Sequence, residues 1–89
     1  MRSALVTGAS TGIGRAAALR LDSDGWRVFA GVRREEDAAA LRAAGSGRLL
    51  PLTLDVTDPL QVAAAAERVD EEVGGTGLDG LVNNAGVPY

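Results

Sequence analysis

The 89-residue chain contains no cysteine, no histidine and no lysine, and only 3% of its residues are aromatic. Without cysteine it can form neither a disulfide framework nor a thiolate metal site. Without histidine it lacks the commonest metal ligand and the usual general base, so we expect no metal site. Since all nine cationic side chains are arginine, chemistry that needs a lysine amine is excluded within these residues, including a Walker-type phosphate loop.

Positive charge and long apolar runs are also scarce. The net charge of −3 argues against nucleic-acid binding, which favours a basic face. The longest apolar run, residues 62–66, is far shorter than the roughly 20 residues that span a membrane, and the first residues do not resemble a signal peptide. The hydrophobic content of 46% is ordinary for a globular protein. We therefore expect one cytoplasmic domain over residues 1–89 that binds neither nucleic acid nor membrane.

Four short apolar runs alternate with three segments of helical periodicity. The predicted strands are residues 3–6, 26–32, 48–55 and 78–83, and the predicted helices are residues 14–24, 35–44 and 59–73. This alternation predicts parallel strands joined by right-handed crossovers, with helices on both faces of the sheet. The expected fold class is α/β, a doubly wound parallel sheet that forms half of a Rossmann-type domain, with the order βαβαβαβ and strand order 3-2-1-4.

Local signals refine this prediction. Pro51 cannot donate a ladder hydrogen bond, which favours an edge position for the third strand. Asp58 is typical of a helix N-cap, with Pro59 at the first helical position and Gln61 as its capping-box partner. Helical spacing assigns two buried faces. They consist of Ile13, Ala17 and Leu21 in the first helix, and Val62, Ala66, Val69 and Val73 in the third.

A glycine-rich loop, TGASTGIG at residues 7–14, joins the first strand to the first helix. At such a junction a pyrophosphate can meet exposed helix N–H groups and the positive end of the helix dipole. Glycine lets the backbone turn sharply and approach phosphates without a Cβ in the way. The spacing is G-x-x-x-G-x-G, which differs from the usual G-x-G-x-x-G dinucleotide fingerprint.

Two further motifs stand at the ends of strands: Leu54-Asp55-Val56 after the third, and Asn83-Asn84-Ala85-Gly86 after the fourth. The three motifs in this order closely resemble the short-chain dehydrogenase/reductase family. The resemblance implies that Asp55 accepts a hydrogen bond from the adenine amino group, with the Val56 amide completing the contact. It also implies that Asn83 braces the central sheet and that Ala85 and Gly86 pass close to the ribose of the cofactor. In the alternative, Asp55 is a helix cap or a solvated turn residue, and Asn83-Asn84 forms a polar turn.

The same resemblance gives roles to six residues of the glycine loop. The residues implied to line the pyrophosphate are Gly8, Gly12, Ile13 and Gly14. Those implied to lie near the adenosine ribose are Ser10 and Thr11. The alternative is a glycine-rich turn that binds nothing.

The end of the second strand bears on which nicotinamide cofactor is used. An acidic residue at this place holds the ribose 2′-OH of NAD, but here the strand ends in Arg33 and Arg34. Arginine suits a 2′-phosphate, so we predict NADP, with Arg33 favoured over Arg34. In the alternative, both arginines are solvated and pair with the acidic cluster at residues 35–37. A Glu35 that reached back to the 2′-OH would restore NAD binding.

The family resemblance implies hydride transfer between the nicotinamide and an alcohol or carbonyl substrate. The family's catalytic groups, a Ser and a Tyr-x-x-x-Lys, come after the fourth strand. Tyr89 is the only tyrosine and has no lysine four residues on, so we assign no catalytic residue here. We expect an incomplete, inactive half-domain of a larger enzyme, one that works as a homo-oligomer. The alternative is a non-catalytic dinucleotide-binding or sheet-completing module that acts with a partner chain.

Overall fold

The computed structural model describes residues 2–74 and 77–83. The predicted site residues Ala85 and Gly86 lie outside this range, as does the side chain of Asn83. The elements follow one another as β1 (Ser3–Thr7), α1 (Gly12–Ser23), β2 (Arg27–Val32), α2 (Glu35–Ala44), β3 (Leu49–Thr53), α3 (Pro59–Val73) and β4 (Gly80–Asn83). All strand pairs are parallel and the order is β3-β2-β1-β4, so the predicted fold class and strand order are confirmed.

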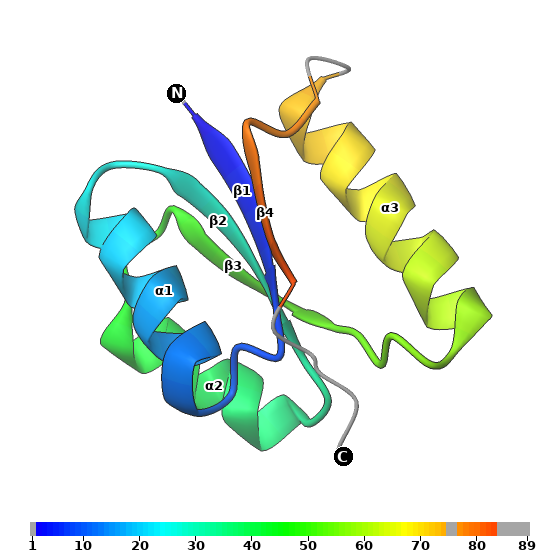
Figure 1. Cartoon of the computed structure of the whole chain (residues 1–89), viewed down its shortest axis with the longest axis horizontal. Coiled ribbons are helices and arrows are strands. Elements are labelled where there is room, and N and C mark those ends of the chain that lie inside the picture. Colours follow the sequence, from blue (N-terminus) through cyan, green and yellow to red (C-terminus); the bar gives the residue numbers. More distant parts are fainter. Residues whose placement is uncertain (1, 75–76, 84–89) are drawn as a thin grey trace.

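Helices cover both faces of the sheet: α1 and α2 lie on one face and α3 lies on the other (Figure 1). Side chains alternate between the two faces along each strand. Val6, Val28 and Ala30 belong to the cluster beneath α1 and α2, whereas Phe29 packs with Val69 and Val73 of α3. None of the helices in the described ranges is long and apolar enough to cross a membrane. The cytoplasmic location stays a prediction.

Pro51 lies in β3, at one edge of the sheet, as predicted. The amide of Leu54 donates to Val32 O at 2.7 Å, so the alternate residues 50, 52 and 54 direct their backbone groups toward β2. The position of the missing Pro51 N–H therefore faces away from the sheet, where no ladder bond is lost.

The predicted inner face of α1 is confirmed only in part: Leu21 is half-buried and packs against the core, and Ala17 is half-buried, but the most buried positions are shifted by one residue. The structure buries Gly14, Ala18 and Asp22, and leaves Ile13 76% exposed at the start of the helix. Small residues at two of these three positions allow α1 to lie close to the sheet. Hydrophobic periodicity missed this face because one of its members is a carboxylate.

The predicted N-terminal cap and buried face of α3 are confirmed only in part. Asp58 is the N-cap, and its Oδ1 accepts from the amides of Leu60 at 3.0 Å and Gln61 at 3.4 Å. The predicted capping-box bond is wrong, because the side chain of Gln61 accepts from the amide of Asp55 instead, at 2.7 Å. The buried face consists of Ala65, Val69 and Val73, whereas Val62 and Ala66 are exposed.

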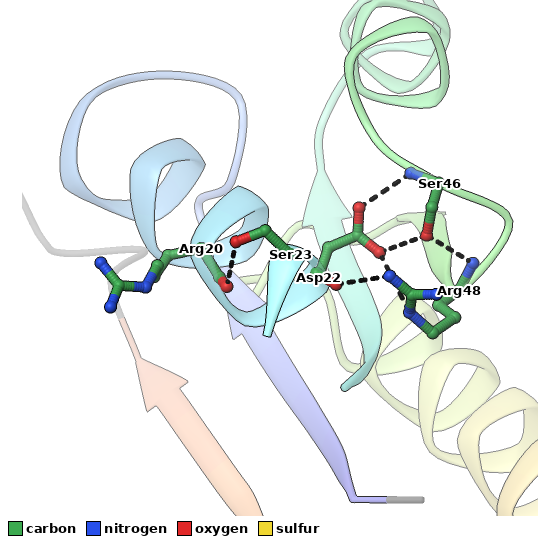
Figure 2. Close-up of polar contacts among 5 residues, drawn as sticks. All are labelled: Arg20, Asp22, Ser23, Ser46 and Arg48. Atoms are coloured by element: carbon green, nitrogen blue, oxygen red, sulfur yellow. Dashed lines mark hydrogen bonds and ion pairs between the residues drawn. The ribbon is translucent and has the colours of Figure 1, made fainter. Parts of the chain in front are cut away.

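A partly buried polar cluster ties the end of α1 to the loop between α2 and β3 (Figure 2). Asp22, whose side chain is 7% exposed, accepts from the amide of Ser46 at 2.8 Å and from the Ser46 hydroxyl. Arg48 donates from Nη2 to Asp22 O at 2.8 Å, and its Nε lies 3.7 Å from Asp22 Oδ1. Because α1 ends just before β2 begins, this cluster lies at the amino ends of the strands, away from the glycine loop.

Candidate functional site

The described parts of the predicted motifs meet at the carboxyl ends of the four strands. The amide of Ala9, in the glycine loop, donates to Gly31 O at the end of β2 at 2.9 Å. A Cβ on Gly31 would lie 3.0 Å from Leu54 Cδ2, so the absence of a side chain lets β2 approach the residue just before Asp55. On the other side of β1, Thr7 pairs with Asn83 of β4. Ligands of open α/β sheets bind at this end of the strands.

Glycine is required at two positions of the loop. Gly8 has φ 62° and Gly12 has φ 59°, in the left-handed region that side chains disfavour. Thr11, Gly12 and Ile13 are exposed, Ser10 is half-buried and Gly14 is buried. The loop therefore presents backbone, small polar groups and the side chain of Ile13 to solvent where α1 begins.

The start of α1 differs from the starts of the other two described helices. Its N-cap, Thr11, makes no side-chain capping hydrogen bond, and its first turn contains no acidic residue. By contrast, α2 begins with three acidic residues and α3 is capped by the Asp58 carboxylate. The first amides of a helix and its dipole attract negative charge, so α1 can receive an anionic group that neither its cap nor its first turn supplies.

The two arginines after β2 have different partners. Arg34 forms an ion pair with Glu36 at 3.5 Å. For this arginine, the structure agrees with the alternative in which it is solvated and pairs with the acidic cluster at residues 35–37. Arg33 instead extends toward Asp55, with Nη2 3.9 Å from Oδ1, and its side chain is 71% exposed. Glu35 pairs along α2 with Arg42 at 3.0 Å, an arrangement that does not reach back toward the ribose position. Arg33 is therefore the cation that the fold places beside the third motif.

Asp55 is held by the turn that follows β3. Its Oδ1 accepts from the Thr57 amide at 2.9 Å and from the Thr57 hydroxyl at 2.6 Å. These two bonds, with the charge of Arg33, hold the pKa of the Asp55 carboxyl below its ordinary value of 3.8, while partial desolvation acts in the opposite direction. Because the pKa is lower in the folded chain, the ionised carboxylate stabilises the fold above about pH 4, and this contribution is lost as the pH falls through the lowered pKa.

Sequence reasoning missed Thr57 at this site. The signal was present, because a Thr two residues after an Asp is typical of a turn in which the carboxylate accepts from the Thr backbone. Val56, which was predicted, lies between them and is 40% exposed. Among the described residues, no group of three or more acidic side chains could hold a metal ion.

Comparison with known proteins identifies relatives of this chain and so bears on the function of the site. A sequence profile of the family described as short chain dehydrogenase matches residues 2–89. The chain is 48% identical to retinol dehydrogenase 5 of Mus musculus over 82 residues. These residues make up 92% of this chain and 26% of that protein. It is 46% identical over 83 residues to dehydrogenase/reductase SDR family member 9 of Homo sapiens, covering 93% of this chain and 26% of that one. The chain thus spans about a quarter of the length of these relatives.

Solved structures show the same fold. A short chain dehydrogenase from Bacillus anthracis superposes with a TM-score of 0.86 at 29% identity, over 94% of this chain and 34% of that chain. A variant of actinorhodin polyketide ketoreductase, crystallised with NADPH, gives a TM-score of 0.84 at 42% identity, over 98% of this chain and 34% of that chain.

Proposed function

This chain belongs to the short chain dehydrogenase family, and from that premise we propose that it is the NADP-binding portion of an oxidoreductase that transfers hydride between the nicotinamide and an alcohol or carbonyl substrate. The observation that carries the proposal is the start of α1, where the glycine loop leads into amides without a capping side chain or an acidic first turn. A dinucleotide pyrophosphate would supply the missing negative charge. That one related structure contains NADPH supports the same choice of cofactor.

Each part of the site has a role in this proposal. The amides at residues 12–14 offset the charge of the pyrophosphate, and Arg33 pairs with the 2′-phosphate. Asp55 accepts from the base, and Ala85 and Gly86 stay predicted contacts of the ribose. The bound cofactor would supply or accept the hydride. We assign proton transfer to residues outside these 89, because the chain contains no lysine and no tyrosine before residue 89.

We expect Arg33→Ala to weaken the binding of NADPH about tenfold or more and that of NADH less than about twofold, since a hydrogen bond to a charged group contributes about 1.5–3 kcal/mol. The measurement is a fluorescence titration of the 89-residue chain with each reduced cofactor. Arg34→Ala is the matched control, because Arg34 is paired with Glu36, and a smaller loss is expected. An equal loss of NADPH and NADH binding in Arg33→Ala would contradict the assignment.

A second candidate function, association through β4, is favoured by one apolar side chain. Leu81 is 63% exposed although it lies in a strand, and β4 is at the edge of the sheet formed by the described residues. An exposed strand edge with an apolar side chain can pair with another chain. We propose that copies of this chain associate along β4, and we expect sedimentation velocity to detect dimers that Leu81→Lys reduces. A folded wild-type monomer at high concentration would contradict this proposal.

A further inference from the structure

The turn from Asp55 to Gln61 holds both the backbone and the side chain of Asp55 by hydrogen bonds. Its backbone is held on both sides: the Asp55 amide donates to Gln61 Oε1 at 2.7 Å, and the Asp58 amide donates to Asp55 O at 2.9 Å. Its side chain is held through Oδ1 by the amide and the hydroxyl of Thr57. The carboxylate therefore has a defined orientation although a third of its side chain is exposed, at 34%.

The two carboxylate oxygens are consequently not equivalent. Oδ1 accepts two hydrogen bonds and is also the oxygen nearest Arg33, at 3.9 Å. Among the hydrogen bonds formed by the described residues, those that reach the Asp55 carboxylate end on Oδ1 and none ends on Oδ2. A carboxylate has about four acceptor sites, two on each oxygen. The turn occupies those of Oδ1, and Oδ2 can accept from a donor outside the protein. The Arg33 side chain is 71% exposed and takes no part in the hydrogen bonds between Thr57 and Asp55, so solvent space is open for it to face a phosphate while those bonds stay in place.

We propose that Thr57 is a positioning residue, which holds the Asp55 carboxylate with Oδ2 as its free acceptor and so makes the site select a purine with an exocyclic amino group. The inference rests on the proposed function, because it concerns the base of the bound dinucleotide. Adenine presents an N–H donor to such an oxygen. Hypoxanthine presents a carbonyl oxygen at the same position, and two acceptors that face each other repel. A site built around a hydrogen bond rejects an analogue that cannot make it.

The experiment compares NADPH with its hypoxanthine analogue, deamino-NADPH, by fluorescence titration of the 89-residue chain. We expect the wild type to bind NADPH about tenfold more tightly, the effect of one charge-assisted hydrogen bond. Thr57→Val removes the hydroxyl but keeps the shape, and it should lower this preference to about threefold or less, since one of the two bonds to Oδ1 is lost. Thr57→Ser restores the hydroxyl and should restore the preference. Thr53→Val makes the same substitution at an exposed residue of β3 and should leave the preference unchanged.

The outcomes separate a positioning role from a structural one. If Thr57→Val weakens both dinucleotides equally and keeps the wild-type preference, Thr57 only stabilises the turn and the inference is wrong. Thr57→Ala provides a second test of the same bond if the valine variant does not fold. A wild-type chain that binds both dinucleotides equally well overturns this inference and the contact of Asp55 with the base, but leaves the proposed binding of the dinucleotide at the glycine loop intact. A wild-type chain that binds neither overturns the proposed function and this inference with it.

Discussion

Asp22→Ala should lower the free energy of unfolding by about 2–4 kcal/mol, because it removes the charged acceptor of two part-buried hydrogen bonds. The side chain of Asp22 is almost fully buried and accepts from both the amide and the hydroxyl of Ser46. A hydrogen bond to a charged group contributes about 1.5–3 kcal/mol, and the ion pair with Arg48 adds little, since the Arg48 side chain is 40% exposed. Domains of this size are stable by only about 5–10 kcal/mol, so the loss is a large fraction of the total.

Urea denaturation, followed by circular dichroism, measures this effect. The matched control is Asp24→Ala, two residues further along. Asp24 also forms an ion pair, with Arg20 at 3.2 Å, but its side chain is 49% exposed. The control should change the unfolding free energy by less than about 0.5 kcal/mol. If Asp22→Ala lowers the free energy of unfolding as little as Asp24→Ala does, the Asp22 cluster does not hold α1 to the loop before β3.

The Asp22 cluster also shows where prediction from the sequence stops. Strand order followed from short apolar runs, intervening helices and Pro51, all of which are local signals. The partners of Asp22 lie 24 and 26 residues away, in a loop whose position depends on the completed sheet. A carboxylate on the inner face of α1 therefore gives no local signal, and hydrophobic periodicity placed the face on its neighbours instead.

The sequence predicted some parts of the candidate site and missed others, for a similar reason. The glycine loop and the turn after β3 could be placed because each follows a strand directly. Gln61 fits the capping-box spacing, yet the turn brings the Asp55 amide to its side chain and leaves Asp58 to cap the helix alone. The sequence favoured Arg33 over Arg34 for the cofactor phosphate, but the approach of Arg33 to Asp55 depends on how β2 and β3 pair, for which the sequence carried no signal.

The largest effect on cofactor binding should come from Gly12→Val, at the first residue of α1. We expect the affinity for NADPH to fall by at least about 100-fold, equivalent to about 2.7 kcal/mol, because the new side chain would stand in front of the amides proposed to hold the pyrophosphate. Nothing lies within 4 Å of a Cβ added to Gly12, so the side chain would clash with no part of the protein. The φ of 59° adds a backbone strain of about 1–2 kcal/mol to the folded chain.

Gly74→Val isolates the effect of that strain. Gly74 ends α3 with φ 63°, and a Cβ there would also meet nothing within 4 Å, so the two substitutions are matched in φ and in the space around the new side chain. Both variants should lose similar unfolding free energy in urea, whereas only Gly12→Val should lose NADPH binding in the fluorescence titration. Retention of wild-type affinity by Gly12→Val would exclude the start of α1 as the pyrophosphate site, because a β-branched side chain and a bound pyrophosphate cannot occupy the same space.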